Sequence, residues 1–233
     1  MIEDNWVKAF ARERAVVAPS LLAADFANLE RELRALEEGG VKIVHVDVMD
    51  GRLVPNISVG VPVVAAIRKV TRLKLDAHLM IVDPERFIEP FVDAGVDSLT
   101  IHIEAAPNPT PILRKIRSLG VAPGLAVNYG TSVEKALPFV GEADLLLTMS
   151  VPAGFGGQRF HEDSLETVRA FRRVVSDDVL LEIDGGIDET TIGAASEAGV
   201  NLFVAGTGVF RSNDYGARAS LLKRLALDAK TRG

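Results

Sequence analysis

Three short apolar segments of this chain contain four side chains that could bind a metal ion or transfer a proton. The segment KIVHVDVMDG carries His45 and Asp47, LKLDAHLM carries His78, and VLLEIDGG carries Asp184. Side chains in a strand alternate faces with period two, so these polar groups share the face opposite the valines and leucines. Two imidazoles and two carboxylates suit a divalent cation of the zinc, iron, manganese or cobalt kind, whereas calcium wants more oxygens. Taken singly, each residue is also compatible with an interior polar residue that is merely hydrogen-bonded. As a set, they predict one divalent metal ion, with zinc first among the four.

Other ionisable residues of these segments are expected to support this set. His102 is expected to be a supporting or structural histidine rather than a ligand, and His161 is expected in a solvated loop. Asp76 and Glu182 fall one layer deeper on the same faces. We expect them to hydrogen-bond Lys74 or to orient a ligand, because buried charges are costly unless they are paired.

Three glycine-rich segments follow the later apolar runs: PAGFGGQ (152–158), DGG (184–186) and AGTG (205–208). Backbone N–H groups in such turns can bind anions. The plainer interpretation is that the glycines only make tight turns. Because the segments converge beside the predicted metal ligands, they favour a phosphorylated substrate.

The elements that must position these residues alternate regularly. Eight strands are expected, over 15–20, 42–48, 73–79, 98–103, 121–127, 144–150, 179–184 and 202–206. Eight helices are expected between and after them, over 25–38, 61–70, 84–94, 110–119, 132–140, 164–175, 188–198 and 215–229. Parallel pairing follows from this alternation, and 233 residues over eight units give about 29 residues each.

The fold class predicted is therefore α/β, a single (β/α)8 TIM barrel, in preference to an open doubly wound sheet. The barrel domain is expected over residues 15–233, after a helical extension over 1–14. Trp6 and Phe10 lie four residues apart in this extension, which suits either a subunit interface or a cap on the bottom of the barrel.

Composition excludes several classes of function. Lys and Arg number 26 against 32 Asp and Glu, a formal net charge of −6, which argues against nucleic-acid and anionic-membrane surfaces. There is no cysteine, so thiolate chemistry and disulfides are excluded. No targeting segment is recognised, and a cytoplasmic location is expected.

The motifs APSLLAADFANL, VHVDVMDGRLVPNISVG, DAHLMIVDPERFI, GFGGQRF, EIDGGI and VAGTGVF resemble those of the ribulose-phosphate 3-epimerase family, from about Val17 to Phe210. The resemblance implies metal-dependent epimerisation at C3 of D-ribulose 5-phosphate to D-xylulose 5-phosphate, a reaction of the pentose phosphate pathway. It also implies an isomerase that acts on a phosphorylated ketose and is a homo-oligomer.

The same resemblance implies roles for individual residues. Asp47 would be the base and Asp184 the acid, and both would hold the metal with His45 and His78. Substrate contacts would come from Ser20, His78, Gly154, Phe155, Gly156, Gly157, Asp184, Gly185, Gly186, Gly206 and Thr207. Met49, Met80 and Met149 would line the site around the reacting carbon.

Three loops depart from the family pattern. After the sixth strand the family usually has Asn-Pro-Gly-Phe-Gly-Gly, where this chain begins with Pro152 and Ala153. After the fifth it often has Asn-Pro, where this chain has Asn128 and Tyr129. After the fourth the family commonly has further histidines downstream of its His-x-Glu, whereas the segment IHIEAAPNPT has none from Glu104 onward. These departures leave open a different ketose phosphate, such as D-allulose 6-phosphate, as the substrate. Two further hypotheses are a sugar-phosphate decarboxylase and a non-catalytic phosphate-binding barrel.

Overall fold

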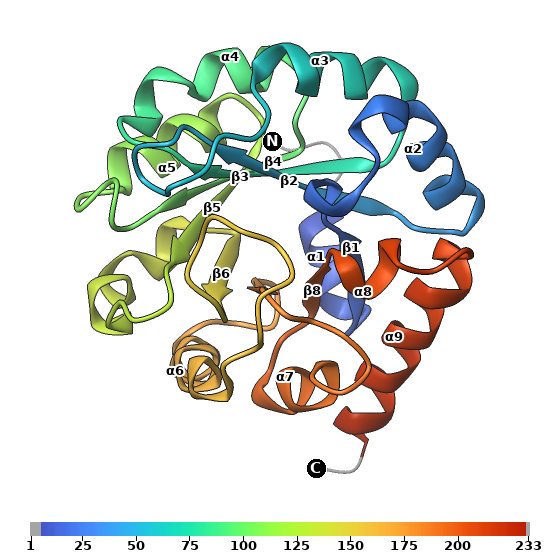
Figure 1. Cartoon of the computed structure of the whole chain (residues 1–233). Coiled ribbons are helices and arrows are strands. Elements are labelled where there is room, and N and C mark those ends of the chain that lie inside the picture. Colours follow the sequence, from blue (N-terminus) through green and yellow to red (C-terminus); the bar gives the residue numbers. More distant parts are fainter. Residues whose placement is uncertain (1–5, 232–233) are drawn as a thin grey trace.

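Eight parallel strands form a nearly closed barrel in the computed structural model, which describes residues 6–231 (Figure 1). They are β1 (Val16–Pro19), β2 (Ile43–Met49), β3 (Lys74–Met80), β4 (Ser98–His102), β5 (Ala122–Val127), β6 (Leu145–Met149), β7 (Leu180–Asp184) and β8 (Leu202–Ala205). From β2 to β8 each strand pairs with the next one in sequence, and β8 pairs with β1. The seam between β1 and β2 is bridged at Ser20 and His45. The predicted TIM barrel is confirmed.

The helices form a ring around the strands (Figure 1). They are α2 (Leu29–Glu38), α3 (Val61–Val70), α4 (Ile88–Asp93), α5 (Thr110–Ser118), α6 (Leu165–Val174), α7 (Ile192–Ala198), α8 (Thr207–Phe210) and α9 (Tyr215–Lys230). Short 3-10 helices precede some of them: η1 (Leu21–Ala23), η2 (Phe26–Asn28), η3 (Pro84–Arg86) and η6 (Glu162–Ser164).

The expected helix over 132–140 is wrong. This connection holds two 3-10 helices, η4 (Val133–Lys135) and η5 (Leu137–Glu142). Pro138 would fall in the interior of a continuous α-helix, where it lacks the N–H that the helix needs and its ring would clash with the preceding turn.

Strand side chains divide between two environments, as the period-two pattern predicts. Leu75, Ala77 and Leu79 of β3 are fully buried in the large apolar cluster between the strands and the helices. The alternate residues of each strand point into the barrel, where they form three layers. Apolar residues fill the bottom of the barrel, ionisable residues the middle, and methionines the mouth.

The N-terminal helix α1 (Trp6–Arg12) covers the bottom of the barrel. Trp6 and Phe10 are 5% and 7% exposed and meet edge to face with ring centroids 5.3 Å apart. Both pack in one cluster with inward residues of the strands, namely Val16, Ala18, Ile43, Ala122, Leu145, Leu180 and Leu202. Of the two roles expected for this aromatic pair, a subunit interface or a cap on the barrel, the contacts in the structure are those of a cap. The pair is covered by its own chain.

We predict that Phe10→Ala lowers the free energy of unfolding by about 3 kcal/mol, because it removes a buried aromatic ring and leaves a cavity. The control is Phe26→Ala, the same truncation at a ring that is 47% exposed, and it should cost about 1 kcal/mol or less. Urea unfolding of the two variants measures the difference. Equal losses would contradict the capping role of α1.

Candidate metal centre and active site

Three of the predicted ligand atoms form a tight triangle inside the barrel. Asp47 and His78 are paired across β2 and β3, and His45 lies one inward position below Asp47. The Nε2 atom of His45 and the Nδ1 atom of His78 are 3.3 Å apart, and each lies 3.4 Å from Oδ1 of Asp47. The Ser20 hydroxyl donates to Oδ2 of Asp47 at 2.6 Å, which leaves Oδ1 facing the two imidazoles.

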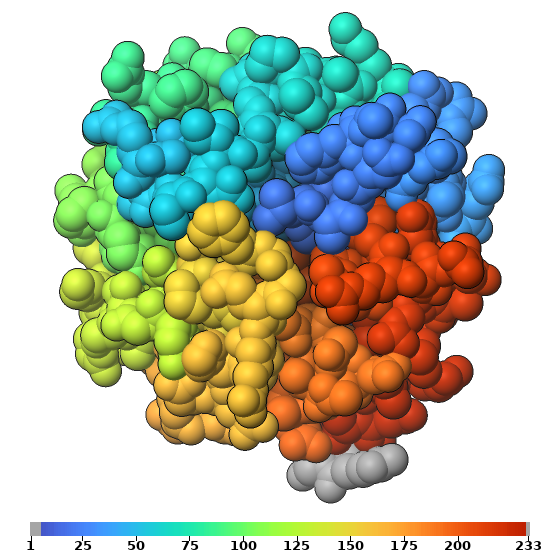
Figure 2. Space-filling view, viewed as in Figure 1, coloured from blue at the N-terminus to red at the C-terminus, as the bar shows by residue number. Residues whose placement is uncertain are grey.

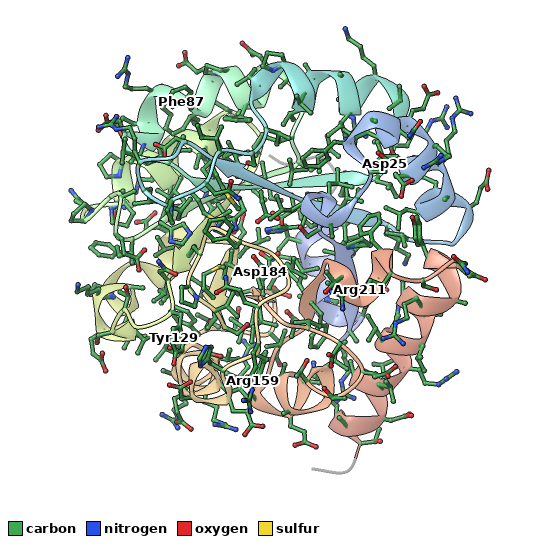
Figure 3. The ribbon with its side chains drawn as sticks, in the orientation of Figure 1. Asp25, Phe87, Tyr129, Arg159, Asp184 and Arg211 are labelled. Carbon is green, nitrogen blue, oxygen red and sulfur yellow. The ribbon has the colours of Figure 1, made fainter. Side chains whose placement is uncertain are left out.

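Asp184 completes the set from β7. One oxygen of its carboxylate lies within 4.8 Å of the ligand atoms of His45, Asp47 and His78. Figure 3 shows Asp184 near the barrel axis, whereas Asp25 and Phe87 lie further out in the helical layer. The structure therefore brings together all four residues that the spacing of the motifs singled out.

Ionisation differs sharply between the two aspartates. Burial raises the pKa of Asp47, but the charge and hydrogen bond of His45 outweigh it and hold the pKa well below the usual range. Burial and the nearby Asp47 charge raise the pKa of Asp184 to about 7. Burial also lowers the pKa of His78 to about 4. At neutral pH the protein thus has an ionised Asp47 beside a titrating Asp184.

A second pair of carboxylates lies below His45. Its Nδ1 is 2.7 Å from Oδ2 of Asp76 and 3.2 Å from Oε1 of Glu182, and all three side chains are fully buried. Burial and the charge of Asp76 raise the pKa of Glu182 well above its usual value. Asp76 thus orients a predicted ligand, one of its two expected roles, while Lys74 pairs with Asp97 instead.

His102 contacts a predicted ligand directly. Its Nε2 lies 2.7 Å from Nε2 of His78, and its Nδ1 lies 3.0 Å from Oε2 of Glu104. This matches the supporting role expected for His102. His161 is exposed, as expected of a loop residue, and its ring stacks on Tyr129.

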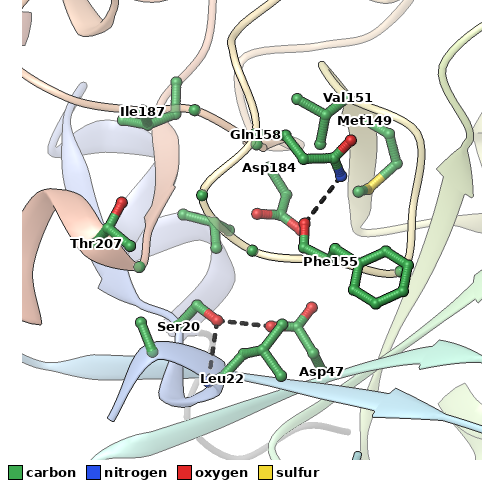
Figure 4. Close-up of a pocket in the computed structure, with 18 of the residues that line it drawn as sticks. Ser20, Leu22, Asp47, Met149, Val151, Phe155, Gln158, Asp184, Ile187 and Thr207 are labelled. Atoms are coloured by element: carbon green, nitrogen blue, oxygen red, sulfur yellow. Dashed lines mark hydrogen bonds between the residues drawn. The ribbon is translucent and has the colours of Figure 1, made fainter. Parts of the chain in front are cut away.

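A cavity of about 320 Å³ opens above the metal-ligand set at the mouth of the barrel (Figure 4). In the space-filling view, the blue residues after β1, the yellow loop after β6 and the red segment after β8 meet at the centre of this face (Figure 2). Of the residues implied to bind substrate or line the site, the cavity wall includes Ser20, Met49, Met80, Met149, Gly154, Phe155, Gly156, Gly157, Asp184, Gly185, Gly186, Gly206 and Thr207. His45 and His78 are fully buried beneath it.

Sequence reasoning missed Gln158 as a residue of this cavity. Its side-chain amide donates to the carbonyls of Pro152 and Phe155, so it closes the loop that carries the glycines. The amide directly follows the GFGG motif, and that position was the available signal. Position 185 requires glycine, because its φ is +116° and a Cβ there would lie 2.6 Å from the Val151 side chain.

The residues present fit a divalent metal ion. Tetrahedral ligands about 2.0–2.1 Å from a zinc-like ion lie roughly 3.3–3.4 Å from one another, which matches the triangle of His45, His78 and Asp47. The buried carboxylates beside these imidazoles would also be neutralised by a dication.

The fold and this site define an enzyme of the TIM-barrel class whose site lies at the carboxyl ends of the strands. A family model described as the ribulose-phosphate 3 epimerase family matches residues 16–210. A Mycobacterium tuberculosis protein named ribulose-phosphate 3-epimerase is 46% identical over 214 residues, which are 91% of this chain and 93% of that protein. The Bacillus subtilis protein of the same name is 43% identical and covers 85% and 93%.

The chain belongs to the ribulose-phosphate 3-epimerase family. It is an isomerase, an epimerase that acts on carbohydrates. Among solved structures, KGPDC from Streptococcus mutans aligns with a TM-score of 0.69 at 14% identity, covering 92% of this chain and 98% of that one. A 3-hexulose-6-phosphate synthase from Salmonella typhimurium aligns at 0.67 and 17% identity, covering 92% and 99%. These two likenesses show the fold alone.

The raised pKa of Asp184 predicts how the stability of the metal-free protein depends on pH. The folded protein keeps a proton on Asp184 up to about pH 7, whereas the unfolded chain releases it near 3.8. The contribution of this group to stability is therefore present below about pH 4 and is lost as the pH rises to about 7. Asp184→Asn should remove this loss.

Urea unfolding of the chelated wild type and Asp184→Asn from about pH 4 to about pH 8 measures the effect. The variant should gain stability relative to wild type as the pH rises through this range. Parallel curves for the two proteins would show that Asp184 keeps an ordinary pKa in the folded protein.

Proposed function

We propose that this chain catalyses the metal-dependent interconversion of D-ribulose 5-phosphate and D-xylulose 5-phosphate at C3. The observation that carries the proposal is the pair of carboxylates from β2 and β7 at the floor of one cavity, beside two buried imidazoles. Epimerisation beside a ketone requires removal of a proton from one face and return of a proton to the other. Carboxylates on strands from different sides of the barrel suit this requirement.

In this proposal Asp47 removes the C3 proton and Asp184 returns one to the opposite face. Asp47 is held ionised by His45 and is oriented by the Ser20 hydroxyl at 2.6 Å. In the metal-free protein Asp184, with a pKa of about 7, holds a proton at neutral pH in an appreciable fraction of molecules. Environments that push two carboxylates apart in pKa are typical of acid–base pairs.

The metal would be held by His45, Asp47, His78 and Asp184. When bound, it would supply a positive charge beside the substrate oxygens, where negative charge develops as the enediolate forms. Zinc is the first candidate from the ligand set, with iron, manganese and cobalt as the others.

The phosphate would bind where the loops after β6, β7 and β8 meet. Gly154, Gly157, Gly185, Gly186 and Thr207 line that part of the cavity. Glycine-rich turns carry no bulky side chain, so their main-chain N–H groups can approach an anion closely. Met49, Met80 and Met149 also line the cavity as part of one apolar cluster, and they would keep water from the reacting carbon.

Location and assembly are part of the same proposal. Among the described residues, no helix is long and apolar enough to cross a membrane. A relative from Oryza sativa, 38% identical, is named as a cytoplasmic isoform, and we propose a cytoplasmic location here. We also propose a homo-oligomer, with residues 15–233 as its catalytic domain and residues 1–14 as an extension.

The first assay measures turnover of D-ribulose 5-phosphate by the metal-loaded protein, beside D-allulose 6-phosphate, and again after chelation. Chelator-sensitive turnover of the pentulose phosphate is the expected result. Turnover of the hexulose phosphate alone would move the specificity to the altered loops. Release of carbon dioxide from a keto-acid phosphate would favour a decarboxylase instead.

Asp47→Asn and Asp184→Asn should each lower kcat about a thousandfold, because each removes one proton-transfer group. Asp228→Asn, an exposed carboxylate on α9, is the matched control and should keep wild-type turnover. Metal content is measured for each variant, since both aspartates are also proposed ligands.

Exchange of the C3 proton in deuterated water separates the two roles. Asp47→Asn should lose exchange from D-ribulose 5-phosphate and keep it from D-xylulose 5-phosphate, and Asp184→Asn should do the reverse. Full turnover by either variant with metal bound would overturn the two-carboxylate mechanism.

A further inference from the structure

A continuous line of polar contacts runs from the metal-ligand set to the loop over the cavity. His78 directs Nδ1 toward the other proposed ligand atoms and Nε2 toward His102. If Nδ1 carries the lone pair that a metal requires, Nε2 carries the hydrogen and donates to Nε2 of His102. His102 then has its hydrogen on Nδ1 and donates it to Oε2 of Glu104 at 3.0 Å. A single assignment of tautomers satisfies every contact in this line.

Glu104 has a second, separate contact with its other oxygen. Oε1 accepts the backbone N–H of Asn128 at 2.9 Å, directly after β5. The side chain is 23% exposed, and it comes from the turn that follows β4. One carboxylate therefore joins the end of the histidine line to the end of the neighbouring strand.

Asn128 extends the line to the loop that follows β6. Its Oδ1 accepts two backbone N–H groups, from Tyr129 at 2.9 Å and from Ala153 at 3.0 Å. These are two of the positions at which the chain departs from the family pattern, and in that pattern both are proline. Proline has no N–H and could not make either bond. The two departures, at Tyr129 and Ala153, thus both provide N–H groups that bond to the same Asn128 oxygen.

We propose that Glu104 is a positioning residue with two functions. One oxygen fixes His102, and through it the His78 ligand, while the other fixes Asn128 and through it the loop that covers the cavity. Outer partners of a metal-ligating histidine set its tautomer and ring orientation, and their loss typically weakens metal binding by about 10- to 100-fold. This inference rests on the metal site of the proposed function.

The test uses two readouts that do not require substrate. Competition titration measures the zinc affinity, and the visible spectrum of the cobalt-substituted protein reports the ligand geometry. Hydrogen–deuterium exchange of the segment 151–158 measures how firmly the loop is held. Glu104 joins a His102 arm, which leads to the metal ligands, to an Asn128 arm, which leads to the loop. Variants on the two arms should therefore change the two readouts separately.

Three variants are expected to give three patterns. His102→Leu should weaken zinc binding by about tenfold or more and leave exchange of the loop unchanged. Asn128→Ala should speed exchange of the loop about fivefold, the effect of a lost hydrogen bond, and leave zinc affinity within about twofold. Glu104→Ala should change both readouts and shift the cobalt spectrum.

Glu104→Gln guards against a folding defect in the alanine variant. It has nearly the same volume but only one acceptor oxygen, so at least one of the two readouts must still change. Asn56→Ala is the control for general loosening of the loop, because the Asn56 side chain, from the connection between β2 and α3, donates to the carbonyl of Gly154 in the same loop. It should speed loop exchange with zinc affinity preserved.

Three outcomes would overturn the inference. Zinc affinity and loop exchange could both stay within about twofold of wild type in Glu104→Gln and Glu104→Ala. Zinc affinity could fall as far in Asn56→Ala as in Glu104→Ala, which would place the effect in loop disorder. If the wild type binds no zinc or cobalt, both the proposed metal site and this inference fail, whereas the first two outcomes leave the proposed function intact.

Discussion

The barrel depends on the mutual neutralisation of ionisable groups around His45. This fully buried imidazole lies between Asp47 toward the mouth and Asp76 toward the bottom. Burial alone would lower its pKa, but the two carboxylates raise the pKa well above the usual value. An unpaired charge in such a place costs several kcal/mol, so each group is tolerable only because the others are present.

This polar layer separates two apolar layers inside the barrel. Apolar side chains such as Ile43 and Leu145 fill the barrel below it, and the methionines line the barrel above it. A shift of β2 by one residue would turn His45 and Asp47 into the helical layer and place valines among the charges. The register of β2 against β3, in which Asp47 faces His78, is therefore set by burial and charge together.

The sequence predicted the fold and the four ligand candidates for a common reason, which is strict alternation within each strand. Such alternation assigns His45, Asp47 and His78 to one face without any knowledge of distant contacts. It could not predict the contact of His102 with His78. The register pairs His78 with Thr100, so His102 lies two residues further along β4 and meets His78 on a diagonal. Cross-strand diagonals depend on the tilt of the strands in the barrel, which a local pattern does not record.

Loop residues lack even this signal. Gln158 and Asn128 lie in loops after strands, where side chains follow no regular period. Asn128 bonds to the main chain of Ala153 in another loop, and Gln158 bonds to the main chain of Pro152 in its own loop. The expected helix over 132–140 failed for a related reason. The spacing of its apolar residues resembles that of an α-helix, but Pro138 prevents a continuous α-helix, and the segment forms 3-10 turns instead.

The same strand geometry accounts for the difference between the two central carboxylates. Asp47 has Ser20, His45 and His78 as neighbours, because β2 lies between β1 and β3. The Ser20 hydroxyl donates to its Oδ2, and one nitrogen of each imidazole lies 3.4 Å from its Oδ1. Asp184 lies at the end of β7, where its flanking partners in register are Met149 and Val204, neither of which offers a side-chain donor. Burial and the Asp47 charge therefore outweigh the opposing charge of His45 and raise the pKa of Asp184. Two identical side chains thus acquire opposite protonation preferences from their different surroundings in the barrel, and the proposed acid–base pair requires this asymmetry.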